Sequence, residues 1–254
     1  MAKLIAIGNQ KGGVAKTTTC LSLGACLAEL RKSVLLIDLD PQANLTLSLG
    51  FQPGALRRTV SDAILHSATL VSISRETGVM GLDVAPANTG LAAVDKVLYR
   101  CRDYEGYLKE ALQEMDRDLY DYVLIDCPPS FGPLTLNALT ASELLIIPTQ
   151  AEYYAERTLQ NVFELLRLVR KRTNSRLRHR LLVTLYDRRN KICQTTLMQL
   201  RSTFPELLFD TIIEIDTKLR ESPSVGQPIT VYQPKTRGAQ QYRALAKELM
   251  RDEG

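Results

Sequence analysis

The chain has 254 residues, of which 45% are hydrophobic and 24% charged, and its formal net charge is +4. That length suits one large α/β domain or two small ones, and no apolar run approaches the roughly 18 residues that a membrane-spanning helix needs. Five cysteines, an odd number without a Cys-x-x-Cys pair, argue against a disulfide framework or a zinc site and favour buried thiols.

Short, continuous, β-branched apolar runs alternate along the chain with helix-length segments. Strands are predicted at residues 4–7, 34–37, 82–85, 122–125, 144–147, 181–184 and 211–215. Amphipathic helices are predicted at residues 17–30, 104–115, 155–170 and 238–250. This alternation predicts an α/β fold, with a mostly parallel twisted sheet and helices on both faces. Residues 50–88 are the least regular part and are expected to form surface loops and small helices.

No linker rich in Pro, Gly or Ser and no internal repeat divides the sequence, so residues 1–254 are expected to form a single domain. The first predicted strand begins at Leu4, which leaves no room for an appended helix-turn-helix domain that reads DNA. The N-terminus lacks the pattern of a secretory signal peptide, and this predicts a cytoplasmic protein.

A glycine pair flanked by lysines follows the first predicted strand. The run reads Lys11-Gly12-Gly13-Val14-Ala15-Lys16-Thr17-Thr18. A strand, a glycine-rich loop and a helix N-terminus form an anion site, because backbone N–H groups point inward and the helix end is partly positive. We expect the whole run to bind a nucleotide, with Lys16 on the β- and γ-phosphates and the Thr17 hydroxyl on Mg²⁺.

The ordinary motif G-x-x-x-x-G-K-[ST] does not match, because Gln10 and Ala15 occupy its two glycine positions. The deviant form K-G-G-x-x-K-[ST] does match, and in it the earlier lysine, Lys11, is the informative residue. The alternative is a generic glycine-containing turn before a helix.

Two other predicted strands end in acids. Asp38 and Asp40 follow residues 34–37, and Asp126 follows residues 122–125 in a Walker B pattern. In an open parallel sheet, ligands bind beyond the carboxyl ends of the strands. We expect Asp40 to orient or deprotonate an attacking water and Asp126 to hold Mg²⁺ through a water. Asp38 either acts at the magnesium site without contacting the ion directly, or caps the following helix.

Positive charge is concentrated in residues 167–191, which hold ten Lys/Arg and the single acid Asp187. Their net charge of +9 leaves −5 for the rest of the chain. Aromatic side chains are scarce there, so stacking on bases is not indicated, but neutralisation of phosphates is. The candidates for DNA binding are Arg188, Arg189 and Lys191, with Lys218, Arg220, Lys235, Arg237 and Arg243 in the late segments. The alternative is a solvated basic face.

Taken together, these residues resemble the ParA/MinD ATPases, specifically the ParA (Soj-like) partition branch. The resemblance rests on the deviant loop, on Asp38-Leu39-Asp40-Pro41-Gln42 and on Asp126-Cys127-Pro128-Pro129. Further similar segments are residues 134–139, 148–154, 221–228 and 234–238. The similarity spans nearly the whole chain and is least in residues 50–88.

This resemblance implies an ATPase that forms a nucleotide-sandwich dimer with ATP and Mg²⁺. Lys11 would reach the phosphates of the partner subunit, Lys16 would serve its own nucleotide, and Asp40 would position the hydrolytic water. The ATP dimer would bind double-stranded DNA without sequence preference and associate with the nucleoid. A ParB-like or other adaptor protein would stimulate slow hydrolysis, and the cycle would move a chromosome, a plasmid or a protein organelle.

The resemblance also places residues 215–220 near the adenine, so Asp216 and Thr184 are candidates for base contacts. One departure from the family is Ala15, which stands where glycine is usual. A methyl group there is tolerable only at negative φ, and we therefore predict a right-handed conformation at Ala15.

Two rival functions remain open. A membrane-cycling ATPase of the MinD type uses a basic amphipathic C-terminal helix with large apolar residues, whereas residues 245–254 lack aromatics and end with Asp252 and Glu253 before Gly254. A metabolic enzyme of the dethiobiotin synthetase or nitrogenase-reductase groups is the other rival. The cysteines do not support an iron–sulfur cluster, and no constellation for a second small substrate is visible.

Overall fold

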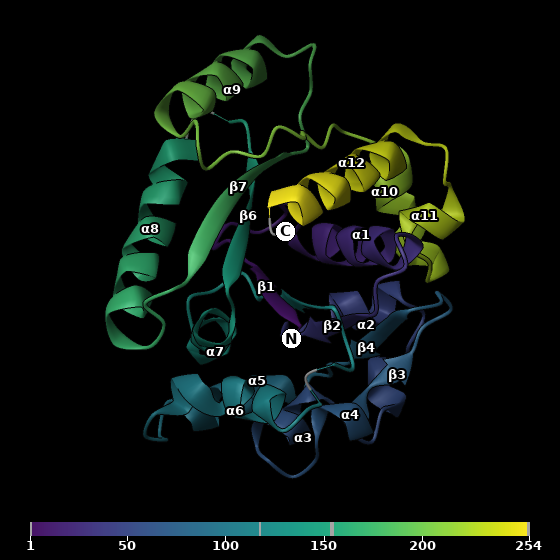
Figure 1. The fold of residues 1–254 in the computed structure, drawn as a ribbon, viewed down its shortest axis with the longest axis vertical. Coiled ribbons are helices and arrows are strands. Elements are labelled where there is room, and N and C mark those ends of the chain that lie inside the picture. The colour runs from purple at the N-terminus through teal and green to yellow at the C-terminus, as the bar shows by residue number, and fades with distance from the viewer. Residues whose placement is uncertain (1, 117, 153–154, 253–254) are drawn as a thin grey trace.

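A computed structural model describes residues 2–116, 118–152 and 155–252. Tyr153 and Tyr154, which contribute to the family resemblance, and Glu253 and Gly254 at the C-terminus lie outside this part of the chain. A seven-stranded sheet runs through the molecule in the order β3-β4-β2-β5-β1-β6-β7 (Figure 1). Its strands are β1 (Lys3–Ile7), β2 (Val34–Asp38), β3 (Arg75–Glu76), β4 (Leu82–Ala85), β5 (Tyr122–Asp126), β6 (Leu144–Gln150) and β7 (Arg178–Thr184). All neighbouring pairs are parallel except β3 and β4, so the predicted fold class is confirmed.

Helices connect the strands, and the four predicted ones are all present. These are α1 (Lys16–Glu29), α6 (Tyr107–Gln113, preceded by the 3₁₀ turn Tyr104–Gly106), α8 (Ala155–Arg172) and α12 (Arg237–Asp252). The remaining helices are α2 (Asn44–Ser48), α3 (Val60–Ile64), α4 (Leu70–Ile73), α5 (Leu91–Leu98), α7 (Pro133–Ala141), α9 (Lys191–Thr203), α10 (Thr217–Glu221) and α11 (Ile229–Tyr232). Two further 3₁₀ turns cover Pro53–Ala55 and Ser222–Val225.

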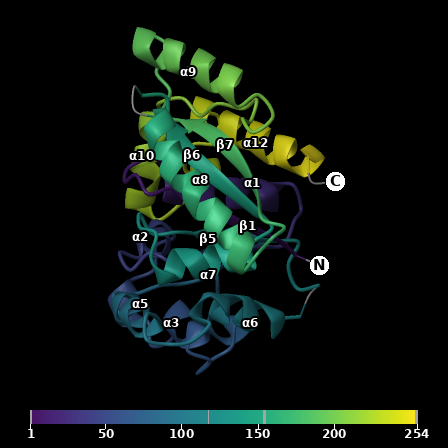
Figure 2. The same ribbon diagram turned by 90° about the vertical axis from the view of Figure 1, so that its left-hand side faces the viewer.

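The sheet is covered on both faces, as Figures 1 and 2 show. Because side chains alternate across a strand, Ile5 and Ile7 of β1 face the apolar cluster formed with α1 and α12, whereas Ala6 faces the opposite cluster. That second cluster draws its helical side chains from α3, α4, α5, α6, α7, α8 and α9. Burial on both faces explains why the strands read as continuous apolar runs rather than alternating ones.

The last predicted strand, residues 211–215, is wrong. β7 ends at Thr184 because Leu185 adopts a left-handed conformation with φ 52°. Beyond that point the two segments share only an isolated bridge between Tyr186 and Glu214, and a regular ladder does not form.

Residues 50–88 also differ from expectation in part. They do form small helices, but Val60 and Ile64 of α3 and Ile73 of α4 are fully buried. This segment therefore contributes to the core as well as to the surface.

Two glycines allow a close backbone contact between distant segments. Gly50, which follows α2, has φ +83°, and Gly226, which follows the Ser222–Val225 turn, has φ +67°. A Cβ on Gly226 would lie 2.9 Å from the Cα of Gly50, which is too close for any side chain. The backbone of the segment after α2 thus contacts the backbone of the segment after the Ser222–Val225 turn directly, with no side chain between them.

The C-terminal helix α12 packs tightly on the body of the protein. Tyr242, Leu245 and Leu249 are buried, and the Tyr242 hydroxyl lies 3.0 Å from the Thr19 hydroxyl of α1. The buried carboxylate of Glu248 accepts hydrogen bonds from the backbone N–H groups of Asp210 and Thr211. No helix in the described part of the chain is long and apolar enough to cross a membrane.

Candidate nucleotide site

The glycine-rich loop joins the end of β1 to the start of α1 and leaves its N–H groups unused. Within the part of the chain that the structure describes, the backbone N–H groups of residues 12–18 have no protein acceptor. The loop carbonyls, in contrast, are occupied. The carbonyl of Lys11 accepts from Lys16 Nζ at 3.0 Å, that of Gly13 from Gln150 Nε2 at 3.4 Å, and that of Val14 from the Thr184 hydroxyl at 3.0 Å. Because these carbonyls accept hydrogen bonds and the N–H groups have no acceptor, the loop can bind an anion through its N–H groups.

Ala15 contradicts the predicted conformation. Its backbone is left-handed, with φ 66° and ψ 35°, immediately before the first residue of α1. The neighbouring Val14 carbonyl is held by Thr184 of β7, while the Ala15 carbonyl already accepts from Thr19 N inside the helix. The chain must change direction between these two anchors, and it does so at Ala15 despite the methyl group. A left-handed alanine costs about 1–2 kcal/mol, which the surrounding contacts offset.

Thr17 and Asp126 meet at the carboxyl end of the central strands. The Thr17 hydroxyl donates to Asp126 Oδ2 at 2.7 Å, and the buried Asp126 Oδ1 has no hydrogen-bond partner among the residues that the structure describes. Burial, and after it the charge of Asp38, raises the pKa of Asp126 well above its ordinary range. This buried carboxylate oxygen, beside a hydroxyl and the anion-binding loop, fits a hydrated Mg²⁺ bound together with phosphate.

This arrangement does not form a complete metal site from protein side chains alone. Among residues 2–116, 118–152 and 155–252, no group of three or more His, Cys, Asp or Glu could hold a metal ion. A magnesium ion here would take most of its ligands from phosphate oxygens and water, as is usual for nucleotide sites.

Lys16 lies under the loop and is buried. Burial lowers its pKa, while the nearby carboxylate of Asp126 acts in the opposite direction. Its ammonium group donates to the Lys11 carbonyl of the loop at 3.0 Å. A buried cation next to unpaired donors is arranged to neutralise a bound anion.

Asp38 is the last residue of β2, next to Asp126 of β5, and Asp40 lies two residues beyond the strand. Asp38 pairs in register with Asp126, and its Oδ2 accepts from both the N–H and the hydroxyl of Thr46 in α2, at 2.9 and 2.7 Å. It thus serves the N-terminal end of the following helix, which was one of the two alternatives. Burial raises the pKa of Asp38 to about 6. Asp40 is also buried, and its Oδ1 accepts from Gln42 N at 2.9 Å.

Lys11 is held by its own chain. Its Nζ donates to Gln150 Oε1 at 2.8 Å and to Glu152 Oε2 at 2.6 Å. The two acceptors lie at the end of β6 and just beyond it, and with Asn9 and Val14 they line a cavity of about 250 Å³ beside the loop. Sequence reasoning did not assign a role to Gln150 or Glu152, although both lie in the segment after the fifth predicted strand.

The two candidates for adenine contacts are engaged within the chain. The buried hydroxyl of Thr184 bonds to the loop at Val14. The carboxylate of Asp216 accepts from Lys218 N at 2.9 Å and from Gly238 N at 2.8 Å, so it joins the first turns of α10 and α12.

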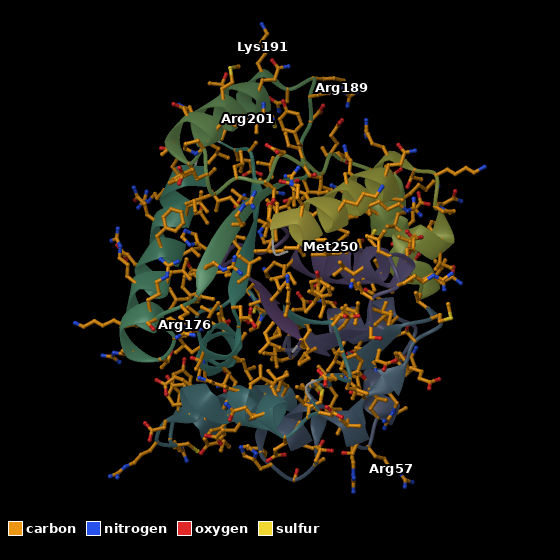
Figure 3. All side chains as sticks on the ribbon, in the orientation of Figure 1. Arg57, Arg176, Arg189, Lys191, Arg201 and Met250 are labelled. Carbon is orange, nitrogen blue, oxygen red and sulfur yellow. The ribbon has the colours of Figure 1, made fainter. Side chains whose placement is uncertain are left out.

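The residues proposed for DNA binding come from three segments of the chain. Arg188, Arg189 and Lys191 lie between β7 and the first turn of α9, Lys218 and Arg220 in α10, and Arg237 at the start of α12. Figure 3 shows Arg189 and Lys191 projecting from the end of the molecule that carries α9.

Several of these cations have acidic partners. Arg189 pairs with Asp187 and Lys218 with Glu221, while Arg188 and Arg237 both reach Glu214. The structure thus brings Arg188 and Arg237 together, which their separation in sequence could not show. Arg243, proposed with them, is instead bound to Glu29 of α1 by two hydrogen bonds of 2.7 and 2.9 Å.

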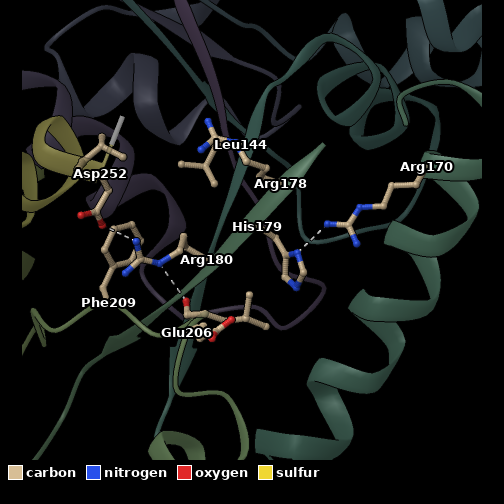
Figure 4. Close-up of a pocket in the computed structure, with 10 residues that line it drawn as sticks. Leu144, Arg170, Arg178, His179, Arg180, Glu206, Phe209 and Asp252 are labelled. Atoms are coloured by element: carbon tan, nitrogen blue, oxygen red, sulfur yellow. Dashed lines mark hydrogen bonds and ion pairs between the residues drawn. The ribbon is translucent and has the colours of Figure 1, made fainter. Parts of the chain in front are cut away.

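A separate cavity of about 310 Å³ lies at the start of β7 (Figure 4). Arg170 of α8 donates to Leu177 O and bonds His179 Nδ1 at 2.9 Å, and Arg180 stacks on the Phe209 ring and pairs with Asp252. Burial and the charge of Arg170 lower the pKa of His179 to about 4. Thr184, which contacts the loop, is at the other end of the same strand, so this cavity is distinct from the nucleotide site.

Comparison with known proteins gives a consistent picture. A family model described as "AAA domain" matches residues 2–179. The sporulation initiation inhibitor protein Soj of Bacillus subtilis is 43% identical over 250 residues, covering 98% of each chain. The chromosome partitioning protein ParA of Caulobacter vibrioides is 38% identical, covering 98% of this chain and 94% of its own.

Among solved structures, a cobyrinic acid a,c-diamide synthase from Mycobacterium smegmatis with bound ATP analogue and magnesium superposes with a TM-score of 0.87. It is 36% identical to this chain, and the match covers 100% of this chain and 96% of that one.

Proposed function

Because the chain belongs to the ParA/MinD family of ATPases, we propose that it is a partition ATPase that binds Mg-ATP in the loop at residues 11–18. In this proposal ATP drives formation of a homodimer, the dimer binds double-stranded DNA without sequence preference, and an adaptor protein stimulates slow hydrolysis. The cycle positions or segregates a cargo on the nucleoid.

One observation supports ATP binding above the others. Backbone N–H groups of residues 12–18 find no acceptor in the described part of the chain, and the buried cation of Lys16 lies beside them. Such donors are costly to leave unpaired, and a row of phosphate oxygens would satisfy them. A related solved structure holds an ATP analogue and magnesium.

Each residue at the site has a proposed role. Lys16 neutralises the β- and γ-phosphates of its own nucleotide, and Lys11 reaches the phosphates of the partner subunit. Thr17 and, through a water, Asp126 hold Mg²⁺, which supplies charge neutralisation on the phosphates. Asp40 positions the hydrolytic water, and Asp38 keeps α2 in place behind it through Thr46. Thr184 and Asp216 are proposed to lie near the base.

The proposed DNA surface consists of Arg188, Arg189, Lys191, Lys218, Arg220 and Arg237. Of these, Lys191 and Arg220 have exposed side chains without an acidic partner in the described part of the chain. Contacts to several phosphates should make binding fall steeply with salt, whereas equal retention on DNA at low and high salt would count against this mode.

The decisive experiment measures the ATPase rate with DNA, with the adaptor protein encoded near this chain's gene, and with both. The proposal expects the two together to raise the rate more than the sum of their separate effects. An additive response, or none, would reject the partition function.

The alternative is a membrane-cycling ATPase of the MinD type. It needs a C-terminal helix with an apolar face free to enter lipid, but Tyr242, Leu245 and Leu249 of α12 are buried against the protein. Co-sedimentation with anionic liposomes in the presence of ATP separates the two functions, because strong binding to lipid would favour the alternative.

A further inference from the structure

Glu214 contacts two arginines of the proposed DNA surface, Arg188 and Arg237. Its Oε2 lies 3.1 Å from an Arg237 guanidinium nitrogen and 3.8 Å from Arg188 Nε. The two arginines are 49 positions apart in the sequence, yet they share one carboxylate oxygen. The carboxylate is 19% exposed, while the arginines are 70% and 45% exposed, so the acid lies beneath its two partners.

The backbone keeps Glu214 opposite Arg188. Tyr186 N donates to Ile213 O and Ile215 N donates to Tyr186 O, which form the isolated bridge between Tyr186 and Glu214. This pairing joins the loop that carries Arg188 to the segment that carries the acid.

The side chain of Glu214 is held from α12. Its Oε1 accepts from Gln241 Nε2 at 3.2 Å, and its backbone N–H donates to Gln241 Oε1 at 2.9 Å. Arg237, on the same helix, also donates to Ile215 O at 2.6 Å. The carboxylate cannot swing away without losing these contacts, so both guanidinium groups converge on one fixed point.

From this geometry we infer that Arg188 and Arg237 form a single site for a phosphodiester group of DNA, and that Glu214 occupies this site as an internal competitor. A carboxylate and a phosphate present similar pairs of acceptor oxygens to guanidinium groups. A DNA phosphate must therefore displace or share the Glu214 contacts, and the acid repels it at short range. Glu214 sets the strength of DNA binding, and this inference rests on the DNA binding proposed above.

The test uses Glu214→Gln, which removes the charge, keeps the shape and can still bond to Gln241. Binding of the full chain with ATP to a labelled duplex of arbitrary sequence is measured across a salt series. We expect about three- to fivefold tighter binding at low salt, since an exposed ion pair of this kind is weak. We also expect the slope of log K against log salt to steepen by about 0.9, because one more phosphate contact releases its counterion.

Glu76→Gln is the matched control. Glu76 is an exposed acid of β3, at the opposite edge of the sheet, and its substitution changes the net charge equally. If Glu76→Gln tightens DNA binding as much as Glu214→Gln does, only net charge matters and the inference fails. If Glu214→Gln weakens binding, the acid positions the arginines instead of competing, and the inference fails as well.

A double-mutant cycle adds a second readout. Arg188→Ala should weaken DNA binding more in the Glu214→Gln background than in the wild type, because the arginine is then free to contact phosphate. Equal losses in both backgrounds would overturn the competition. Failure of the wild-type protein to bind DNA with ATP would instead reject the proposed function, so the two failures are distinguishable.

Discussion

Lys11 and Glu152 form an ion pair in which Nζ lies 2.6 Å from Oε2, and Gln150 holds the same ammonium group from the other side. Lys11 is the residue that we propose to enter the partner subunit's site. Within a single chain it is already bound, so dimer formation must first separate it from Glu152.

Releasing this pair should favour the dimer. We expect Glu152→Gln to lower the dissociation constant of the ATP dimer by up to about 30-fold, because each of two exposed pairs is worth up to about 1 kcal/mol. Analytical ultracentrifugation with a non-hydrolysable ATP analogue measures this. Glu156→Gln, the same charge change in the first turn of α8, is the control. An unchanged dissociation constant for Glu152→Gln would show that the pair does not restrain Lys11.

Substitutions of the two lysines of the loop should affect different properties, nucleotide binding for Lys16 and dimer formation for Lys11. Lys16→Ala should weaken nucleotide binding by more than about 100-fold, because it removes the buried cation beside the free N–H groups. Lys11→Ala should keep binding within about tenfold of wild type and lose the dimer. Titration with a fluorescent ATP analogue and sedimentation measure the two properties. Loss of nucleotide binding in Lys11→Ala would place that lysine in its own subunit's site.

Asp40→Ala should stop hydrolysis after the dimer has formed. Removing a group that orients the attacking water is expected to lower the rate about 100-fold or more, while the phosphate contacts remain. The ATP dimer should therefore accumulate, as measured by size-exclusion chromatography and phosphate release. A variant that hydrolyses ATP at the normal rate would show that another group positions the water.

Ala15→Gly should stabilise the protein. A glycine accepts φ 66° without steric cost, so the free energy of unfolding should rise by about 0.5–1 kcal/mol after the larger unfolded-state entropy of glycine is included. Urea unfolding measures the change. Ala92→Gly in α5 is a control with the opposite sign, because glycine inside a helix destabilises. A destabilised Ala15→Gly variant would mean that the methyl group makes favourable contacts.

His179 should give stability a pH dependence. Burial and Arg170 lower the folded-state pKa to about 4 from an ordinary value of 6.5, so the unfolded chain binds more protons between these limits. The contribution of His179 is therefore fully present above pH 6.5 and is lost as the pH falls to about 4. Since the ring is partly exposed, we expect the effect to be about 1 kcal/mol.

His179→Gln should flatten the pH dependence. The glutamine amide can still accept from Arg170 but does not titrate in this range. Urea unfolding of both proteins between pH 4 and 7 compares the two slopes. Parallel curves would show that His179 keeps an ordinary pKa.

Much of the candidate nucleotide site can be predicted from the sequence because its parts are local. A strand, the loop at residues 11–18 and a helix follow one another directly, and Asp38 and Asp126 each end an apolar run. Parallel pairing then brings these strand ends together without further information.

What could not be predicted depends on contacts between distant segments. The conformation of Ala15 follows from anchors on β7 and α1, and the partners of Lys11 lie 139 and 141 positions away. Likewise, residues 211–215 have strand-like composition, but the left-handed turn at Leu185 ends the neighbouring strand before a ladder can form. The composition of a segment shows that it can form a strand, but the strand forms only if the neighbouring backbone continues alongside it.

The contact between Gly50 and Gly226 has a consequence for divergence among relatives. Position 226 cannot gain a side chain while the Gly50 segment keeps its path, because a Cβ there would lie 2.9 Å from the Gly50 Cα. A Cβ on Gly50 would have room, but the φ of +83° at that position disfavours any side chain. A related chain that carries a larger residue at position 226 must therefore reroute the loop after α2 or the turn before α11. Loss of the glycine at position 226 would therefore mark a branch in which the segments around Asp40 and Asp216 pack differently.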